Sequence, residues 1–88
     1  MLSPTTNEAE ALALSALAAT LTDERRAQRF LELTGLSPDG IREGLGERSL
    51  LAATLAFLES HEPDLIDVAD AIGCKPEALI AARAELER

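Results

Sequence analysis

Aromatic side chains and valine are scarce in this sequence of 88 residues. It contains two Phe, one Val, and neither Trp nor Tyr. Because aromatic and β-branched side chains favour strands, this scarcity argues against a fold built from sheets. Alanine and leucine, which favour helices, occur 16 times each. With 47% hydrophobic residues the chain is also too apolar to remain disordered, so the composition predicts an all-α protein.

Positive charge is equally scarce. Eight Lys and Arg stand against 16 Asp and Glu, which gives a net charge of −8. Proteins gain affinity for nucleic acids and for anionic membranes mainly by neutralising phosphates, so this balance disfavours both as partners. A single cysteine excludes an internal disulfide and suits a reducing cytosol. The longest mostly apolar stretch, residues 11–21, is too short to span a bilayer, and residues 1–8 lack the positive region of a signal peptide. We therefore expect a cytoplasmic protein.

Capping residues and helix breakers divide the chain into about six short helices that form one compact bundle over residues 1–88. Thr5-x-x-Glu8 is typical of a capping box that opens a helix over about 6–20. Gly35 and Gly73 are typical of residues that end helices, and Pro residues open the following ones. The other five helices are expected from Thr22 or Asp23 to Gly35, from 37 to 44, from 47 to 60, from 63 to 73 and from 76 to the C-terminus.

One pattern occurs twice. Gly35-Leu36-Ser37-Pro38 is echoed by Gly73-Cys74-Lys75-Pro76, 38 residues later. The echo predicts two tandem three-helix units over about 8–46 and 47–88. The alternative is that Gly-x-x-Pro is simply a common way to join two helices.

The helix over 6–20 is apolar on all sides. Leu14, Leu17 and Leu21 form one stripe, and Leu12, Ala16 and Ala19 lie opposite it. Such a helix either lies at the centre of the bundle or presents one face to a second chain, which leaves a homodimer open. Later helices have ordinary inner faces, formed by Leu51, Thr54, Leu55 and Leu58 and by Leu79, Ala82 and Leu86.

The segment from Arg29 to Arg42, RFLELTGLSPDGIR, resembles a family of short, mainly alphaproteobacterial proteins known as domain of unknown function 3572. The resemblance spans roughly residues 8–86. It implies a small all-helical protein, and it supplies no activity and no catalytic or binding residues.

A shorter resemblance covers residues 65–86, which are similar to the helix-turn-helix of bacterial transcription regulators. Ala69 would let two helices cross closely, and Gly73 would make the turn. Lys75, Arg83 and Arg88 are the only positive charges on the second helix, and neighbouring glutamates balance them. DNA binding is therefore an unfavoured hypothesis.

Two charged clusters are candidates for a partner surface. Arg25, Arg26 and Arg29 lie within one turn of a helix and could bind carboxylates or phosphates. The competing interpretation pairs them with Glu24 and Glu32, or with the acidic helix over 63–73.

The second cluster is acidic. Asp64, Asp67 and Asp70 step by three residues and could dock a basic partner. The competing interpretation is a solvated helix start, where carboxylates are favourable. A metal site at His61, Asp64 and Asp67 is a much weaker hypothesis, because one His with two carboxylates is not a specific pattern.

Nothing in the sequence predicts catalysis. Cys74 is expected to be a small buried hydrophobe, and no spacing argues that it meets His61 as a nucleophile–base pair. We expect no catalytic residues, cofactor or metal. The leading hypothesis is a non-enzymatic module of a bacterial cytoplasm that binds another protein. The alternative is a transcription-associated protein that acts through residues 65–86.

Overall fold

The computed structural model describes residues 4–88 of the chain. Within these residues the chain forms six α-helices and no strand. The all-α prediction is confirmed, and the first three residues of the expected 1–88 domain lie outside the described residues. The helices are α1 (Thr6–Thr20), α2 (Glu24–Thr34), α3 (Pro38–Gly44), α4 (Arg48–Glu59), α5 (Glu62–Ile72) and α6 (Pro76–Leu86).

Side-chain caps start the first three helices. Thr5 Oγ1 accepts a hydrogen bond from the Glu8 amide at 3.1 Å, and Glu8 Oε1 accepts one from the Thr5 amide at 2.8 Å, which completes the predicted capping box. Of the two predicted caps for α2, the cap is Asp23, whose Oδ1 accepts from the Arg26 amide at 2.9 Å. Ser37 caps α3 in the same way. The local sequence therefore fixes where these helices begin.

Both echoed glycines adopt the left-handed conformation that ends a helix, with φ of 72° at Gly35 and 77° at Gly73. Their hydrogen bonds differ. The Cys74 amide donates to the Ala69 carbonyl at 2.9 Å, as in a Schellman motif. After α2, the Gly35 amide donates to the Leu31 carbonyl at 2.9 Å instead. The backbone conformation thus recurs without the same hydrogen bonds, and the duplication itself stays a prediction.

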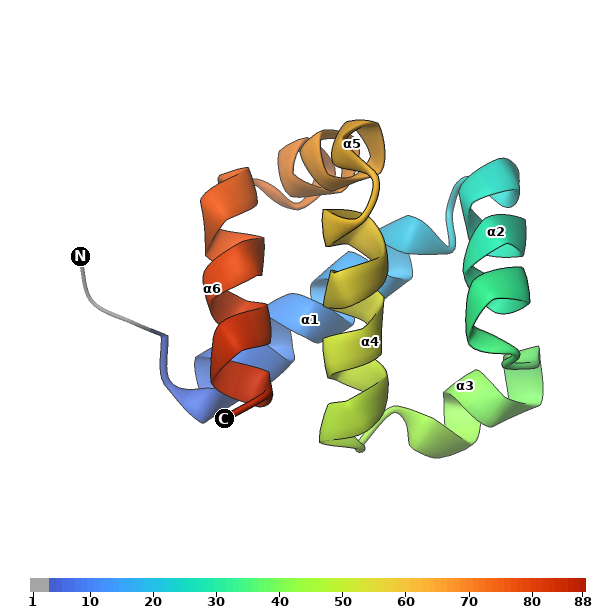
Figure 1. Cartoon of the computed structure of the whole chain (residues 1–88), viewed down its shortest axis with the longest axis horizontal. Helices are drawn as coiled ribbons and strands as arrows, with labels where there is room; N and C mark the ends of the chain where they lie inside the picture. The colour runs from blue at the N-terminus through green and yellow to red at the C-terminus, as the bar shows by residue number, and fades with distance from the viewer. Residues whose placement is uncertain (1–3) are drawn as a thin grey trace.

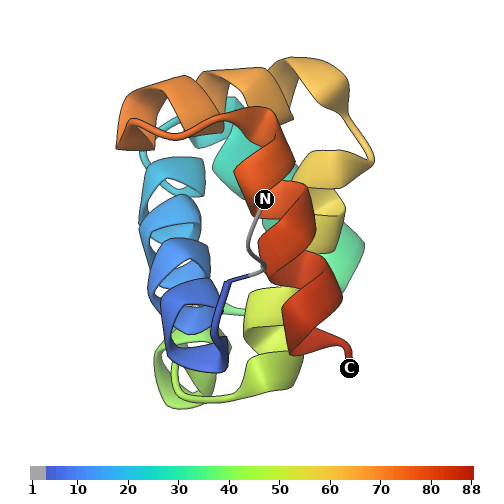
Figure 2. The same cartoon turned by 90° about the vertical axis from the view of Figure 1, so that its left-hand side faces the viewer.

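Helix α1 packs on α4, α5 and α6; it runs behind α4 and α6 in Figure 1 and forms one side of the molecule in Figure 2. Its packed face is built from Ala9, Ala13, Ala16 and Leu17, and the three alanines let the neighbouring helices approach closely. The predicted leucine stripe does not form one buried face: Leu17 is buried, whereas Leu14 and Leu21 remain exposed. A helix that is apolar all round therefore supplies the core and still shows an apolar face to solvent.

The other predicted inner faces are confirmed. Leu51, Thr54, Leu55 and Leu58 of α4 are all buried, and so are Leu79, Ala82 and Leu86 of α6. The buried Thr54 hydroxyl donates to the Leu50 carbonyl at 2.9 Å, which satisfies the only polar group on that face of α4. Helices α1, α4, α5 and α6 thus form a four-helix core.

Helices α2 and α3 stand to one side of that core (Figure 1). Of the eleven residues of α2, Phe30 alone is fully buried. Its ring meets Phe57 of α4 edge to face, with centroids 5.2 Å apart and planes at 75°. Helix α3 then returns the chain to α4 along the lower edge in Figure 1. This arrangement leaves most of α2 exposed. It also leaves an open space between α2, α3 and α4.

Candidate interaction surface

The predicted basic and acidic clusters meet inside the molecule. Arg26 and Arg29 of α2 both form ion pairs with Asp64 of α5; Arg26 Nη1 lies 3.9 Å from Asp64 Oδ1, and Arg29 Nη2 hydrogen-bonds to Asp64 Oδ2. Asp64 is buried, and the Arg26 side chain is nearly so. The interpretation that pairs the arginines with acidic α5 therefore holds for these three residues.

This cluster joins four helices. Arg26 Nη2 also donates to the Ala19 carbonyl at the C-terminus of α1, at 3.0 Å, where a cation is favourable. The Arg29 guanidinium carbon lies 5.4 Å from the centre of the Phe57 ring of α4. Arg26 Nε is buried without a hydrogen-bond partner. These contacts make the cluster a tie between α2 and the core.

The remaining members of the predicted partner surface lie apart from this tie. Arg25 is exposed and lines an open pocket of about 520 Å³ with Leu21 and Leu31. Asp67 and Asp70 are exposed on the outer side of α5, where the solvated-face interpretation applies to them but not to Asp64. The six predicted residues therefore do not form one continuous surface.

The other chemical candidates do not come together. His61 Nδ1 lies 3.2 Å from Asp64 Oδ2, but no group of three or more His, Cys, Asp or Glu side chains in residues 4–88 is placed to hold a metal ion. His61 precedes α5 and Cys74 follows it, so roughly 20 Å of helix separates them at 1.5 Å per residue. Cys74 is half-buried against the core, and burial raises the pKa of its thiol, which suits a small hydrophobe.

Helices α5 and α6 do form a corner around Gly73, but α6 lies packed against α1 and α4. Two of the three positive charges predicted for it, Arg83 and Arg88, form ion pairs, and Lys75 is exposed. Arg83 pairs with Glu59 and Glu87, and the hydrogen bond to Glu59 raises the pKa of that guanidinium. Arg88 pairs with Glu85. Exposed Glu77, Ile80 and Ala84 dominate the outer side of α6, which offers little to a phosphate backbone.

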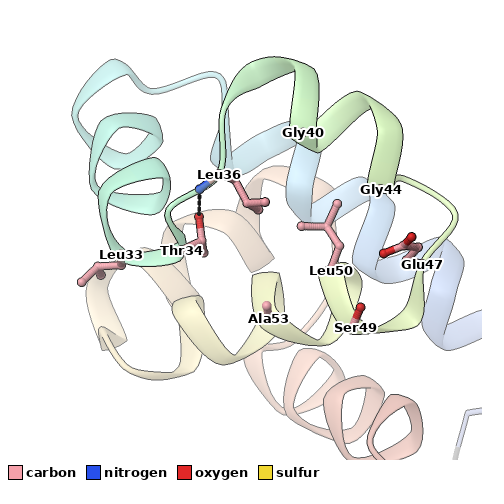
Figure 3. Close-up of a pocket in the computed structure, with 9 residues that line it drawn as sticks. All are labelled: Leu33, Thr34, Leu36, Gly40, Gly44, Glu47, Ser49, Leu50 and Ala53. Carbon is pink, nitrogen blue, oxygen red and sulfur yellow. Dashed lines mark hydrogen bonds between the residues drawn. The ribbon is translucent and has the colours of Figure 1, made fainter.

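An apolar groove of about 410 Å³ opens between α2, α3 and α4 (Figure 3). It is lined by Leu33, Thr34, Leu36, Gly40, Gly44, Glu47, Ser49, Leu50 and Ala53. Leu36 and Leu50 form its inner surface, and Leu33 and Glu47 lie at its two ends (Figure 3). Its volume falls within the range of about 300–1,000 Å³ that is typical of binding pockets.

The groove depends on close contact between α3 and α4. A Cβ at Gly44 would lie 3.1 Å from Leu50 Cδ2, so the buried glycine lets α3 rest directly against that leucine. On the opposite wall, the Thr34 hydroxyl donates to the Phe30 carbonyl at 2.7 Å and accepts from the Leu36 amide at 3.3 Å. The chain leaving α2 is thereby held, and Leu36 is directed into the groove (Figure 3).

Leu33 is 69% exposed, the most exposed large apolar side chain among the described residues. It lies at the rim, three residues after the buried Phe30 but turned away from the core. The groove was not predictable from the sequence, because its residues come from three separate segments of the chain. The one sequence feature that could have indicated the groove is Leu33. It is a large apolar residue near the end of α2 that does not lie on the buried face of that helix.

The acidic end of the groove carries a charge that the chain does not neutralise. Six of the eight basic side chains donate to a carboxylate or a backbone carbonyl: Arg26, Arg29, Arg42, Arg48, Arg83 and Arg88. Within residues 4–88, Glu47 forms no ion pair, and neither does Glu43 of the adjoining α3. Part of the excess negative charge of the chain is therefore exposed at this end of the groove, on Glu43 and Glu47.

No helix in the described part of the chain has both the length and the apolar character needed to cross a membrane. A family model described as "Protein of unknown function (DUF3572)" matches residues 6–88. No curated protein and no solved structure gives a significant match to the chain.

Proposed function

Because the chain belongs to the family of proteins of unknown function DUF3572, whose description names no activity, we propose its function from the groove. The chain is a non-enzymatic protein–protein interaction module of a bacterial cytoplasm. It takes an apolar segment of another protein into the apolar groove between α2, α3 and α4. The exposure of Leu33 at the rim is the observation that carries this proposal.

Leu33 supports a binding role because its exposure has no use within the chain. Helix α2 is held by Phe30 and by the ion pairs to Asp64, and neither contact involves Leu33. Leu36 and Leu50 continue the apolar surface inward from the rim. Exposed apolar side chains that join into one concave surface, with polar groups at its edge, are typical of protein-binding sites.

The alternative, a transcription-associated protein acting through residues 65–86, has less support. Its second helix, α6, is packed against α1 and α4, and two of its three positive side chains are paired. A gel-shift titration with duplex DNA at low salt separates the two proposals. Salt-sensitive binding at micromolar protein would favour the helix-turn-helix.

Photo-crosslinking tests the interaction proposal. A photoreactive phenylalanine analogue replaces Leu33 at the groove, and in a matched control it replaces Leu14, which is 41% exposed on α1. Both variants are expressed in bacterial cells and irradiated. We expect discrete protein adducts from position 33 that position 14 does not give. The same adducts from both positions, or none from position 33, would contradict a binding role for the groove.

A further inference from the structure

The apolar groove has one apolar and one acidic end, which restricts what fits it. Leu33 marks the apolar end, and Glu47, the residue before α4, marks the other (Figure 3). We infer that the occupant is an amphipathic helix contributed by a partner protein. One face of this helix is apolar, and its polar face is positively charged. This inference rests on the proposed function and adds the chemistry of the partner.

The apolar requirement comes from the groove's inner surface. Leu36, Leu50 and Ala53 present aliphatic atoms, while the Thr34 hydroxyl is already engaged with the Phe30 carbonyl and the Leu36 amide. An occupant therefore gains little from placing a polar group against Thr34, and the other polar side chains of the groove, Glu47 and Ser49, lie toward its acidic end. Side chains such as leucine, spaced three and four residues apart on a helix, suit a groove of this kind.

The positive requirement comes from charge complementarity. Glu47 lines the groove, and Glu43 is exposed on the adjoining helix α3; neither has an ion-pair partner among the described side chains. Arg42 directly precedes Glu43 in sequence, but it pairs with Asp39 at 2.8 Å. Lysine or arginine beside the apolar face of an incoming helix would meet these carboxylates.

The same charges disfavour two other occupants. A second copy of the chain brings its own net charge of −8 to this acidic end. An acidic amphipathic helix meets the same repulsion. A small apolar molecule would leave the carboxylates beside the groove without partners.

Two model peptides test the inference with the full chain. Both carry the same leucine face and one Trp; one has Lys and the other Glu on its polar face. The chain contains no Trp, so peptide indole fluorescence reports binding without background from the protein. At about 50 mM salt we expect the Lys peptide to bind at least about tenfold more tightly than the Glu peptide, a gap that narrows as salt screens the charges.

Paired variants locate the binding. Leu33→Ser should weaken the Lys peptide about fivefold or more, whereas Leu14→Ser, at an exposed leucine outside the groove, should not. Glu47→Gln should weaken it about threefold and flatten its salt dependence, whereas Asp67→Asn on the outer side of α5 should have less effect. Circular dichroism checks that each variant stays folded.

The outcomes that would overturn the inference are distinct. Equal binding of the Glu peptide, still weakened by Leu33→Ser, would show that the groove binds helices but that the charge argument is wrong. Equal effects of Leu33→Ser and Leu14→Ser would show only general attraction to an acidic surface. Amide NMR shifts confined to the groove on concentrating the protein alone would identify a second copy as the occupant. Binding of neither peptide, with no adduct from position 33, would remove the proposed function as well.

Discussion

Phe30 of α2 and Phe57 of α4 are the only aromatic residues of the chain, and their rings pack against each other edge to face at 5.2 Å. One ring comes from the helix outside the four-helix core and the other from inside it. The same Phe57 ring also lies beneath the guanidinium of Arg29. A single aromatic residue of the core thus contacts two side chains of α2, Phe30 and Arg29.

Removing this ring contact should detach α2. We expect Phe30→Ala to lower the free energy of unfolding by about 3–5 kcal/mol, because it deletes a fully buried ring from a close-packed site. Phe30→Leu should cost about 1.5 kcal/mol or less. Urea denaturation measures both values, and hydrogen exchange should show the amides of α2 and α3 opening before those of α4. Leu33→Ala, on the same helix, is the control and should change stability by about 0.5 kcal/mol or less.

Neutralising Asp64 should leave two arginines without their shared carboxylate. We expect Asp64→Asn to lower the free energy of unfolding by about 2 kcal/mol, since Arg26 is nearly buried and keeps only its bond to the Ala19 carbonyl. The matched control is Asp67→Asn, one helical turn later and exposed, which should shift stability by about 0.5 kcal/mol or less. Equal effects of the two substitutions in denaturation experiments would contradict a specific role for Asp64.

The two left-handed glycines should resist substitution. Gly35→Ala and Gly73→Ala should each lower the free energy of unfolding by about 1 kcal/mol, because a Cβ is unfavourable at positive φ even though neither site is crowded. Gly46→Ala is the control: this glycine also has open space around it but does not have a positive φ. Thermal melts should therefore place the control at or above the unsubstituted chain.

Acid should weaken the contact between the two ends of the described chain. Thr6 Oγ1 donates to Glu85 Oε2 at 2.8 Å, and this hydrogen bond, helped by Arg88, lowers the pKa of Glu85 below its ordinary 4.5. The unfolded chain then takes up the proton at a higher pH than the folded one. The stabilisation is therefore complete above pH 4.5 and is lost as pH falls through the lower, folded pKa.

Two substitutions test this pH dependence. Glu85→Gln and Thr6→Val should both flatten the fall in stability below pH 4.5, measured by urea denaturation across that range. Some slope should remain in each variant. The Thr5 amide lowers the pKa of Glu8, and the Arg26 amide lowers that of Asp23, so these caps lose stability in the same direction. An unchanged slope in Glu85→Gln would contradict the assignment.

Helix boundaries were predictable because their causes are local. Thr5 and Glu8 complete a capping box with each other, and Gly73 needs only its own backbone to end α5. The inner face of α4 was predictable for a similar reason, since helical periodicity alone places Leu51, Leu55 and Leu58 together. Such features can be predicted without knowing which helices pack against each other.

Burial of individual charges was not predictable in this way. Asp64 and Asp67 are chemically identical and three residues apart, yet only Asp64 faces α2 and becomes buried. That choice depends on where α2 docks, and α2 docks through Phe30, a contact between distant parts of the chain. The groove has the same origin, because it exists only once α3 has carried the chain from α2 back to α4.

Because Leu33 is exposed, its effect on function can be measured separately from its effect on folding. A substitution there removes almost nothing from the interior, so the steady-state amount of the protein in a cell should hardly change. In a mutational scan that records abundance and growth for every variant, substitutions of Phe30 should lower both. A growth defect at Leu33 with normal abundance would have its cause in another molecule.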